Sequence, residues 1–148
     1  MQPFAGQALL ATPAVTNGGG ATGLNFLSSF LDACTGCHFD MINIHHYVDR
    51  SSTNVDQAVS ALKSYIETNV PALQAKHPSI QGLPIMIGEF WLWNASPAEG
   101  GTYLESIMPY LDANTNIIGY QAFGGLWTGN FITSDGNGLT PAGTAYKN

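Results

Sequence analysis

The stretch IMIGEFWL, from Ile85 to Leu92, decides the fold of this 148-residue chain. It is apolar or aromatic apart from a glycine and one glutamate, and a short continuous apolar run of this kind is typical of a strand buried in a parallel sheet. Residues two apart on a strand point to the same face. We therefore expect one face of this strand to hold Ile85, Ile87, Glu89 and Trp91.

Working outward from this stretch, three more apolar runs predict strands: ALLATPAV over Ala8–Val15, MINIHHY over Met41–Tyr47 and IIGYQAF over Ile117–Phe123. Segments with helical periodicity lie between and after the runs, over Leu24–Ala33, Val55–Ala75, Thr102–Asp112 and Thr140–Lys147. Asn54 and Ser96 suit helix starts, and Pro71 is expected to break the longest helix. The alternation predicts one α/β domain over residues 1–148, built of TIM-barrel-type (β/α) units with about four parallel strands.

The composition excludes several classes of partner. Hydrophobic residues make up 45% of the chain and charged residues 9%, so disorder is not expected. With Lys+Arg 4 against Asp+Glu 10, no basic surface is available to bind nucleic acid or anionic lipid. No apolar run approaches the roughly 18 residues of a membrane span. Little charge and many small polar and aromatic residues are typical of secreted carbohydrate-handling proteins, so we expect an extracellular or cell-wall location, although Met1–Ala14 contains no recognisable export signal.

Glu89 is the one carboxylate inside the four apolar runs. Desolvating a carboxylate must be offset by a partner or used in chemistry, so Glu89 is the best catalytic candidate. The alternative is a structural glutamate bonded to a histidine or a backbone amide. Glycoside hydrolysis needs two carboxyl groups, and Asp49 and Asp135 follow strands, but both positions suit turns equally well.

Polar and aromatic side chains gather on and after the predicted strands. Asn43, His45 and Tyr47 share a face and suit sugar hydroxyls or the orientation of a carboxylate. His46 points the opposite way, which argues against a metal site and places it under a helix. Flat indole rings near strand ends can stack on sugars, or pack in the core, and the candidates for stacking are Trp91 and Trp127, with Trp93 close by.

Two short motifs have simple interpretations. The glycines of Gly18–Gly23 fit the dinucleotide pattern, but Pro13 is awkward in a central strand and no acidic residue ends the second run, so a flexible loop is favoured and no cofactor is expected. Cys34 and Cys37 follow a helix and precede a strand, the reverse of a thioredoxin-type motif, which favours a local disulfide in an exported protein. A glycosylation sequon at Asn94 agrees weakly with export.

Several motifs in order resemble fungal glycoside hydrolases of the alkali-sensitive-linkage type, glycoside hydrolase family 128, which mostly act on β-1,3-glucan. The motifs are ATPA (Ala11–Ala14), FLDACTGC (Phe30–Cys37), FDMINIHHY (Phe39–Tyr47), IMIGEF (Ile85–Phe90) and Phe123-Gly124. The resemblance implies a (β/α)8 barrel in which Glu89 is the nucleophile and His45 and Tyr47 are substrate-side groups. Asn43, Trp91 and Trp127 are added from strand geometry alone.

The family's acid/base glutamate lies in an Asn-Glu-Pro motif, which this sequence does not contain. The four predicted strands resemble strands five to eight, and 148 residues fall short of the roughly 200 to 250 of a complete barrel. The resemblance therefore implies the C-terminal half of an enzyme. A half barrel has sheet edges whose backbone groups are unpaired. We therefore expect the half barrel to pair with a second copy of itself in a homodimer or with an absent N-terminal half.

Three functions follow as hypotheses. The leading one is a glycoside hydrolase-type domain that acts on fungal cell-wall β-1,3-glucan by a retaining two-carboxylate mechanism, with the acid/base half missing. The second is a catalytically inactive β-glucan-binding or wall-associated protein. The third is a nucleotide-binding domain that uses the glycine loop.

Overall fold

The computed structural model describes residues 2–124 and 130–148, and a three-stranded parallel sheet in the order β1-β2-β3 lies at its centre. β1 covers Ile42–Asp49, β2 covers Ile85–Trp93 and β3 covers Ile117–Ala122. Helices separate consecutive strands, and consecutive strands are neighbours in the sheet, which is the βαβ arrangement. Three of the four predicted strands are thus confirmed, with ends that differ from the prediction by at most two residues.

The fourth predicted strand, over Ala8–Val15, is wrong. The segment runs parallel to β1 but forms only two isolated bridges there, Ala11 with Met41 just before β1 and Val15 with Ile44 of β1. Pro13 lies between the bridges and has no N–H to donate to a strand ladder. The Thr12 hydroxyl instead accepts a hydrogen bond of 3.0 Å from a backbone N–H of β1. The segment therefore lies along the edge of β1 without extending the sheet.

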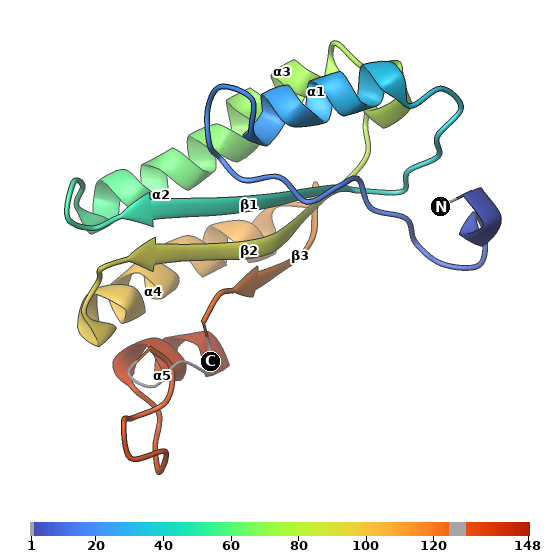
Figure 1. The fold of residues 1–148 in the computed structure, drawn as a ribbon. Coiled ribbons are helices and arrows are strands. Elements are labelled where there is room, and N and C mark those ends of the chain that lie inside the picture. The colour runs from blue at the N-terminus through green and yellow to red at the C-terminus, as the bar shows by residue number, and fades with distance from the viewer. Residues whose placement is uncertain (1, 125–129) are drawn as a thin grey trace.

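Five α-helices flank the sheet in the described parts of the chain (Figure 1). They are α1 (Gly23–Ala33), α2 (Val55–Ser64), α3 (Val70–Gln74), α4 (Pro97–Ala113) and α5 (Pro141–Lys147). Figure 1 shows α1, α2 and α3 alongside β1, and α4 along β2 and β3. α5 packs against α4. Short 3₁₀ helices cover Gln2–Phe4 and Pro78–Ile80. None of the described helices has the length and apolar character that crossing a bilayer requires.

The helix starts follow the capping residues. Asn54 caps α2 and Ser96 caps α4, each in a reciprocal capping box. Pro71 does not break the helical run, contrary to the prediction. A π-helical turn over Tyr65–Asn69 joins α2 to α3, and Pro71 lies in the first turn of α3, where an absent N–H is tolerated. α4 begins at Pro97 for the same reason, earlier than the periodicity predicts.

The core forms where one face of the sheet meets the helices. On β1 the buried side chains alternate, with Ile42, Ile44 and His46 covered and the intervening residues partly exposed. The fully buried helical side chains that pack with them include Leu62, Val70, Tyr103, Leu104 and Ile107. The other face of β1 is left to Asn43, His45 and Tyr47, as the alternation predicts.

A β-bulge interrupts β2 at Gly88. Ile44 of β1 pairs with Ile87, but the next residue of β1, His45, pairs with Glu89, so Gly88 has no opposite residue. The bulge reverses the side-chain alternation, and Ile87 and Glu89 point to opposite faces. The prediction that Ile85, Ile87, Glu89 and Trp91 share one face is therefore wrong.

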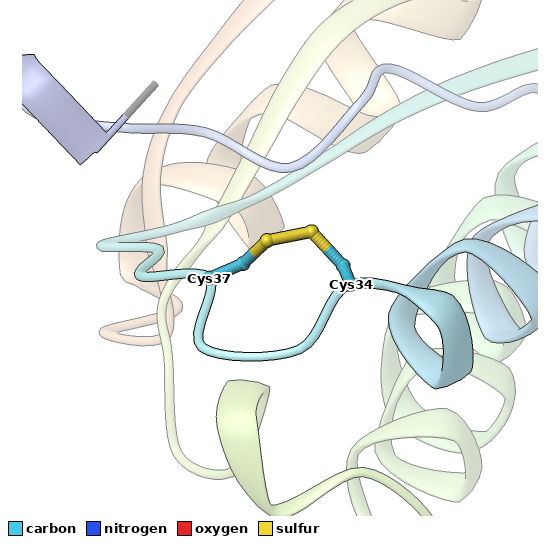
Figure 2. Close-up of a disulfide and its surroundings, with 2 residues drawn as sticks. All are labelled: Cys34 and Cys37. Atoms are coloured by element: carbon cyan, nitrogen blue, oxygen red, sulfur yellow. A yellow bond between two sulfur atoms is a disulfide. The ribbon is translucent and has the colours of Figure 1, made fainter.

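A disulfide joins Cys34 and Cys37 in the loop between α1 and β1 (Figure 2). Cys34 directly follows the last residue of α1, and Figure 2 shows the bond closing the loop that leads toward β1. The two residues are three apart in sequence. The chain-entropy model assigns so small a loop about 2 kcal/mol or less, so this bond shapes the loop more than it stabilises the domain.

Candidate active site

The C-terminal halves of β1 and β2 bring three polar side chains together: Glu89, His45 and Tyr47. His45 Nδ1 lies 3.1 Å from Glu89 Oε2. The Tyr47 hydroxyl donates a short hydrogen bond to the same oxygen. The Glu89 side chain is 34% exposed and that of His45 is 20% exposed, so the cluster is open to a ligand. We call these three residues the Glu89 cluster.

The electrostatics of the Glu89 cluster keep Tyr47 protonated. Burial raises the pKa of Tyr47 well above its usual range, and the hydrogen bond to Glu89 and the negative charge of that carboxylate raise it further. Tyr47 is therefore a hydrogen-bond donor at neutral pH. The Tyr47 hydroxyl keeps its proton and, by donating it in a hydrogen bond, orients the Glu89 carboxylate.

Aromatic rings surround Tyr47 where the three strands end. Trp93 stacks on the Tyr47 ring, with centroids 5.4 Å apart, and Phe123 meets the same ring edge-on at 5.7 Å. Trp93 and Phe123 also contact each other. The sequence pattern had indicated Trp93 as one of three tryptophans able to stack on a sugar, but it did not indicate Phe123. The position of Phe123 just after β3 was the available signal.

The other predicted ligand-binding residues are placed differently. Asn43 lies on the same face as His45, and its Oδ1 is buried without a hydrogen-bond partner among the described residues. Trp91 is 3% exposed and packs edge-on against Phe131, so its ring lies in the core and outside the Glu89 cluster. Trp127 lies outside the described residues. The structure thus brings Asn43 beside the cluster and does not bring Trp91 there.

The two alternative carboxylates are held by hydrogen bonds outside the Glu89 cluster. Asp49 accepts hydrogen bonds from Ser51 and Asn94, which lower its pKa. Asp135 accepts them from Thr133 and Asn137, with the same effect on its pKa. Both groups are thus ionised at neutral pH and engaged by other polar groups, which does not suit a proton donor.

His46 is packed beneath the helices, as the sequence predicts. It is 3% exposed, and its ring lies 5.2 Å from that of Tyr65 in the π turn. In the described part of the chain, no three His, Cys, Asp or Glu side chains are grouped so as to hold a metal ion. Burial lowers the pKa of His46 from 6.5 to about 4, so this side chain is neutral at pH 7.

Acidification is expected to destabilise the fold through His46. Because its pKa is lower in the folded state, its contribution to stability is complete above about pH 6.5 and is lost as the pH falls through about 4. The difference between the pKa of His46 in the unfolded and the folded state corresponds to on the order of 3 kcal/mol in the free energy of unfolding. Urea denaturation at about pH 7 and pH 4 measures this loss in the free energy of unfolding.

The loss of unfolding free energy on acidification is compared between the wild type and a His46→Phe variant, whose ring does not titrate. We expect it to lose on the order of 3 kcal/mol less than the wild type between the two pH values. His38→Gln is the control, because the His38 side chain is 52% exposed. An equal acid loss in wild type and His46→Phe would show that other groups cause it.

Comparisons with known proteins identify the family of the chain. Residues 1–146 match the family model described as "Glycosyl hydrolase catalytic core". Strand–helix units with polar side chains at the strand ends are the arrangement that (β/α) catalytic domains use to form their sites. The chain belongs to the glycosyl hydrolase catalytic core family, and solved structures similar to it include members of glycoside hydrolase family 128.

Three relatives illustrate the similarity. Alkali-sensitive linkage protein 1 of Schizosaccharomyces pombe is 28% identical over 151 residues, which cover 93% of this chain and 24% of that protein. An endo-β-1,3-glucanase from Sorangium cellulosum superposes with a TM-score of 0.68 at 26% identity, over 93% of this chain and 54% of the other. An oligosaccharide-binding protein from Trichoderma gamsii has the same fold, with a TM-score of 0.64 at 20% identity over 99% and 54%. The chain thus spans about a quarter of the first protein and about half of each solved structure.

Proposed function

We propose that this chain is a glycoside hydrolase-type domain that acts on β-1,3-glucan, with Glu89 as the nucleophile of a retaining mechanism. The observation that carries the proposal is the arrangement around Glu89. Both His45 and Tyr47 approach Oε2, and Oε1 accepts no hydrogen bond from the described residues. One carboxylate oxygen is thus held while the other is available to a substrate. The named activity of the Sorangium cellulosum neighbour supports the choice of β-1,3-glucan.

The proposed reaction assigns a role to each group of the cluster. Oε1 of Glu89 attacks the anomeric carbon as the glycosidic C–O bond breaks, and a covalent glycosyl-enzyme forms. Tyr47 and His45 orient the carboxylate and balance part of its charge. Water then hydrolyses the intermediate, the sugar leaves with its original configuration, and Glu89 is restored as a carboxylate.

The leaving oxygen needs a proton from a second carboxyl group, roughly 5 to 5.5 Å from the first in retaining enzymes. Asp49 and Asp135 are engaged by hydrogen bonds away from Glu89, so we place this acid/base outside residues 1–148. Another polypeptide segment that completes the barrel is the proposed source. Without a proton donor, hydrolysis loses about 10²- to 10⁴-fold in rate.

A second candidate function is β-glucan binding without catalysis. The Trichoderma gamsii neighbour, named as an oligosaccharide-binding protein, shares the fold, which makes a non-catalytic role a specific alternative. The Glu89 cluster would then serve as a set of hydrogen-bonding groups for sugar hydroxyls. The Tyr47 hydroxyl and the Glu89 carboxylate supply a donor and acceptors for that purpose.

We also propose an extracellular or cell-wall location. The disulfide between Cys34 and Cys37 supports it, because disulfides persist in oxidising compartments. Labelling of free thiols in protein isolated from its natural source without reductant tests the proposal. Recovery of both cysteines as free thiols contradicts it.

Laminarin turnover measured beside laminarin binding tests the function. Release of reducing ends supports the hydrolase, and binding without turnover supports the carbohydrate-binding alternative. Xylan is the control polymer, since a nonspecific polysaccharide surface would retain both polymers. The absence of binding and turnover in the isolated chain, and again after addition of a partner segment that carries the acid/base, contradicts both functions.

A further inference from the structure

Gly88 occupies the bulge of β2, and the bulge decides where Glu89 points. Ile44 pairs with Ile87 while His45 pairs with Glu89. Since Ile44 and His45 point to opposite faces of β1, the bulge moves Glu89 away from the buried face of Ile87 and onto the face of His45. A regular strand would place Glu89 on the buried side.

The space beside Gly88 is closed by the side chains of the site. A Cβ atom on Gly88 would lie 2.5 Å from Asn43 Oδ1 and 3.1 Å from His45 Nε2. The first distance is too short for any real contact, and the second requires the imidazole to move. His45 Nδ1 is the atom beside Glu89 Oε2, so a displaced ring changes that contact as well.

The requirement for glycine at this position is spatial. Gly88 is not among the glycines with positive φ, so alanine can adopt its backbone conformation. A Gly88→Ala substitution therefore adds one methyl group against Asn43 and His45 without left-handed strain. This property makes the substitution a direct probe of the contact.

We infer that Gly88 is a positioning residue, whose missing side chain lets Asn43 and His45 close over the bulge and so sets the contact between His45 and Glu89. The catalytic consequence rests on the proposed function of Glu89, whereas the structural consequence does not. Two readouts therefore separate a failure of this inference from a failure of the proposed function.

The first readout is the ¹⁵N NMR spectrum of the His45 imidazole at neutral pH. A carboxylate 3.1 Å from Nδ1 favours the proton on that nitrogen, so the wild type is expected to show the Nδ1–H tautomer. Gly88→Ala is expected to give a mixed tautomer signal. Gly119→Ala is the matched control, because Gly119 also lies in a strand and its added Cβ meets the flexible side chain of Met86 at 3.2 Å.

The second readout is laminarin turnover, where a displaced nucleophile lowers kcat by about tenfold to 10²-fold. The KM is expected to change less than about threefold, because the added methyl group faces Asn43 and His45 and leaves Oε1 of Glu89 unobstructed. Gly119→Ala is expected to retain wild-type kinetics. Absence of turnover in every protein refutes the proposed catalysis, and the NMR readout still decides the role of Gly88.

Trimming Asn43 completes the test. The effect of Gly88→Ala on the His45 signal is measured in the wild type and again in the Asn43→Ala background. We expect the smaller effect in the Asn43→Ala background, because Asn43 Oδ1, the atom closest to the added methyl group, is absent there. If Gly88→Ala folds poorly, the double variant is used to measure the effect of the added methyl group on His45. An unchanged His45 spectrum in Gly88→Ala, or an equal change with and without the Asn43 side chain, overturns the inference.

Discussion

Replacement of Glu89 by glutamine is expected to lower laminarin turnover by about 10³-fold or more in the assembly that carries the acid/base. The amide has the shape of the carboxylate and still accepts a hydrogen bond from Tyr47. It carries no negative charge with which to attack the anomeric carbon and stabilise the oxocarbenium-like transition state. The measurement is kcat from reducing-end release, alongside laminarin affinity, which we expect to stay within about threefold of wild type.

Glu105→Gln is the matched control, because it removes the same charge from an exposed position on α4. We expect this variant to retain the wild-type rate. The Glu89→Gln variant also loses the charge that raises the pKa of Tyr47, so the pKa of Tyr47 should fall in a tyrosinate absorbance titration. Equal turnover in Glu89→Gln and wild type would remove Glu89 from the mechanism and leave the carbohydrate-binding function.

Much of the sheet could be predicted because its strands are continuous apolar runs. β1 and β2 begin and end within two residues of the runs that predict them. The segment over Ala8–Val15 has the same composition but contains Pro13, and one missing donor reduces it to two bridges. A proline inside an apolar run should therefore have counted more heavily than the composition around it.

The candidate site could be predicted in part for a geometric reason. Parallel strands end at the same edge of a sheet, so His45 and Tyr47 on one strand and Glu89 on the next were expected near the same edge. That they share one face depends on the bulge. The face of Glu89 was assigned by counting from Ile85, and the bulge at Gly88 reversed that count. A glycine inside a strand pattern was the signal, because it often marks a bulge.

The tryptophans could not be assigned from local sequence. Trp91 and Trp93 are two residues apart on β2, yet Trp91 packs against Phe131 and Trp93 stacks on Tyr47. The burial of Trp91 depends on α5 and on the segment that precedes it, about forty residues later in the chain. Contacts at that separation are tertiary, and strand periodicity contains no information about them.

Phe90→Ala is expected to have the largest effect on stability among these substitutions, at about 3 to 5 kcal/mol. Phe90 is fully buried in the central strand, and its ring contacts those of Tyr103 on α4 and Tyr120 on β3. Removing the ring leaves a cavity between the sheet and α4 that neighbouring side chains fill incompletely. Denaturant unfolding followed by far-UV circular dichroism gives the change in the free energy of unfolding.

Phe26→Ala is the control for Phe90→Ala, because the same truncation on α1 removes a side chain that is 48% exposed. A change within about 0.5 kcal/mol is expected there. Phe90→Leu, which refills part of the volume, should lose about 1.5 kcal/mol or less. Equal losses at positions 90 and 26 would contradict the packing described for β2. Since Phe90 directly follows Glu89 and its carbonyl accepts a hydrogen bond from Phe123 N–H, the packing that stabilises the domain also fixes the backbone that carries the proposed nucleophile.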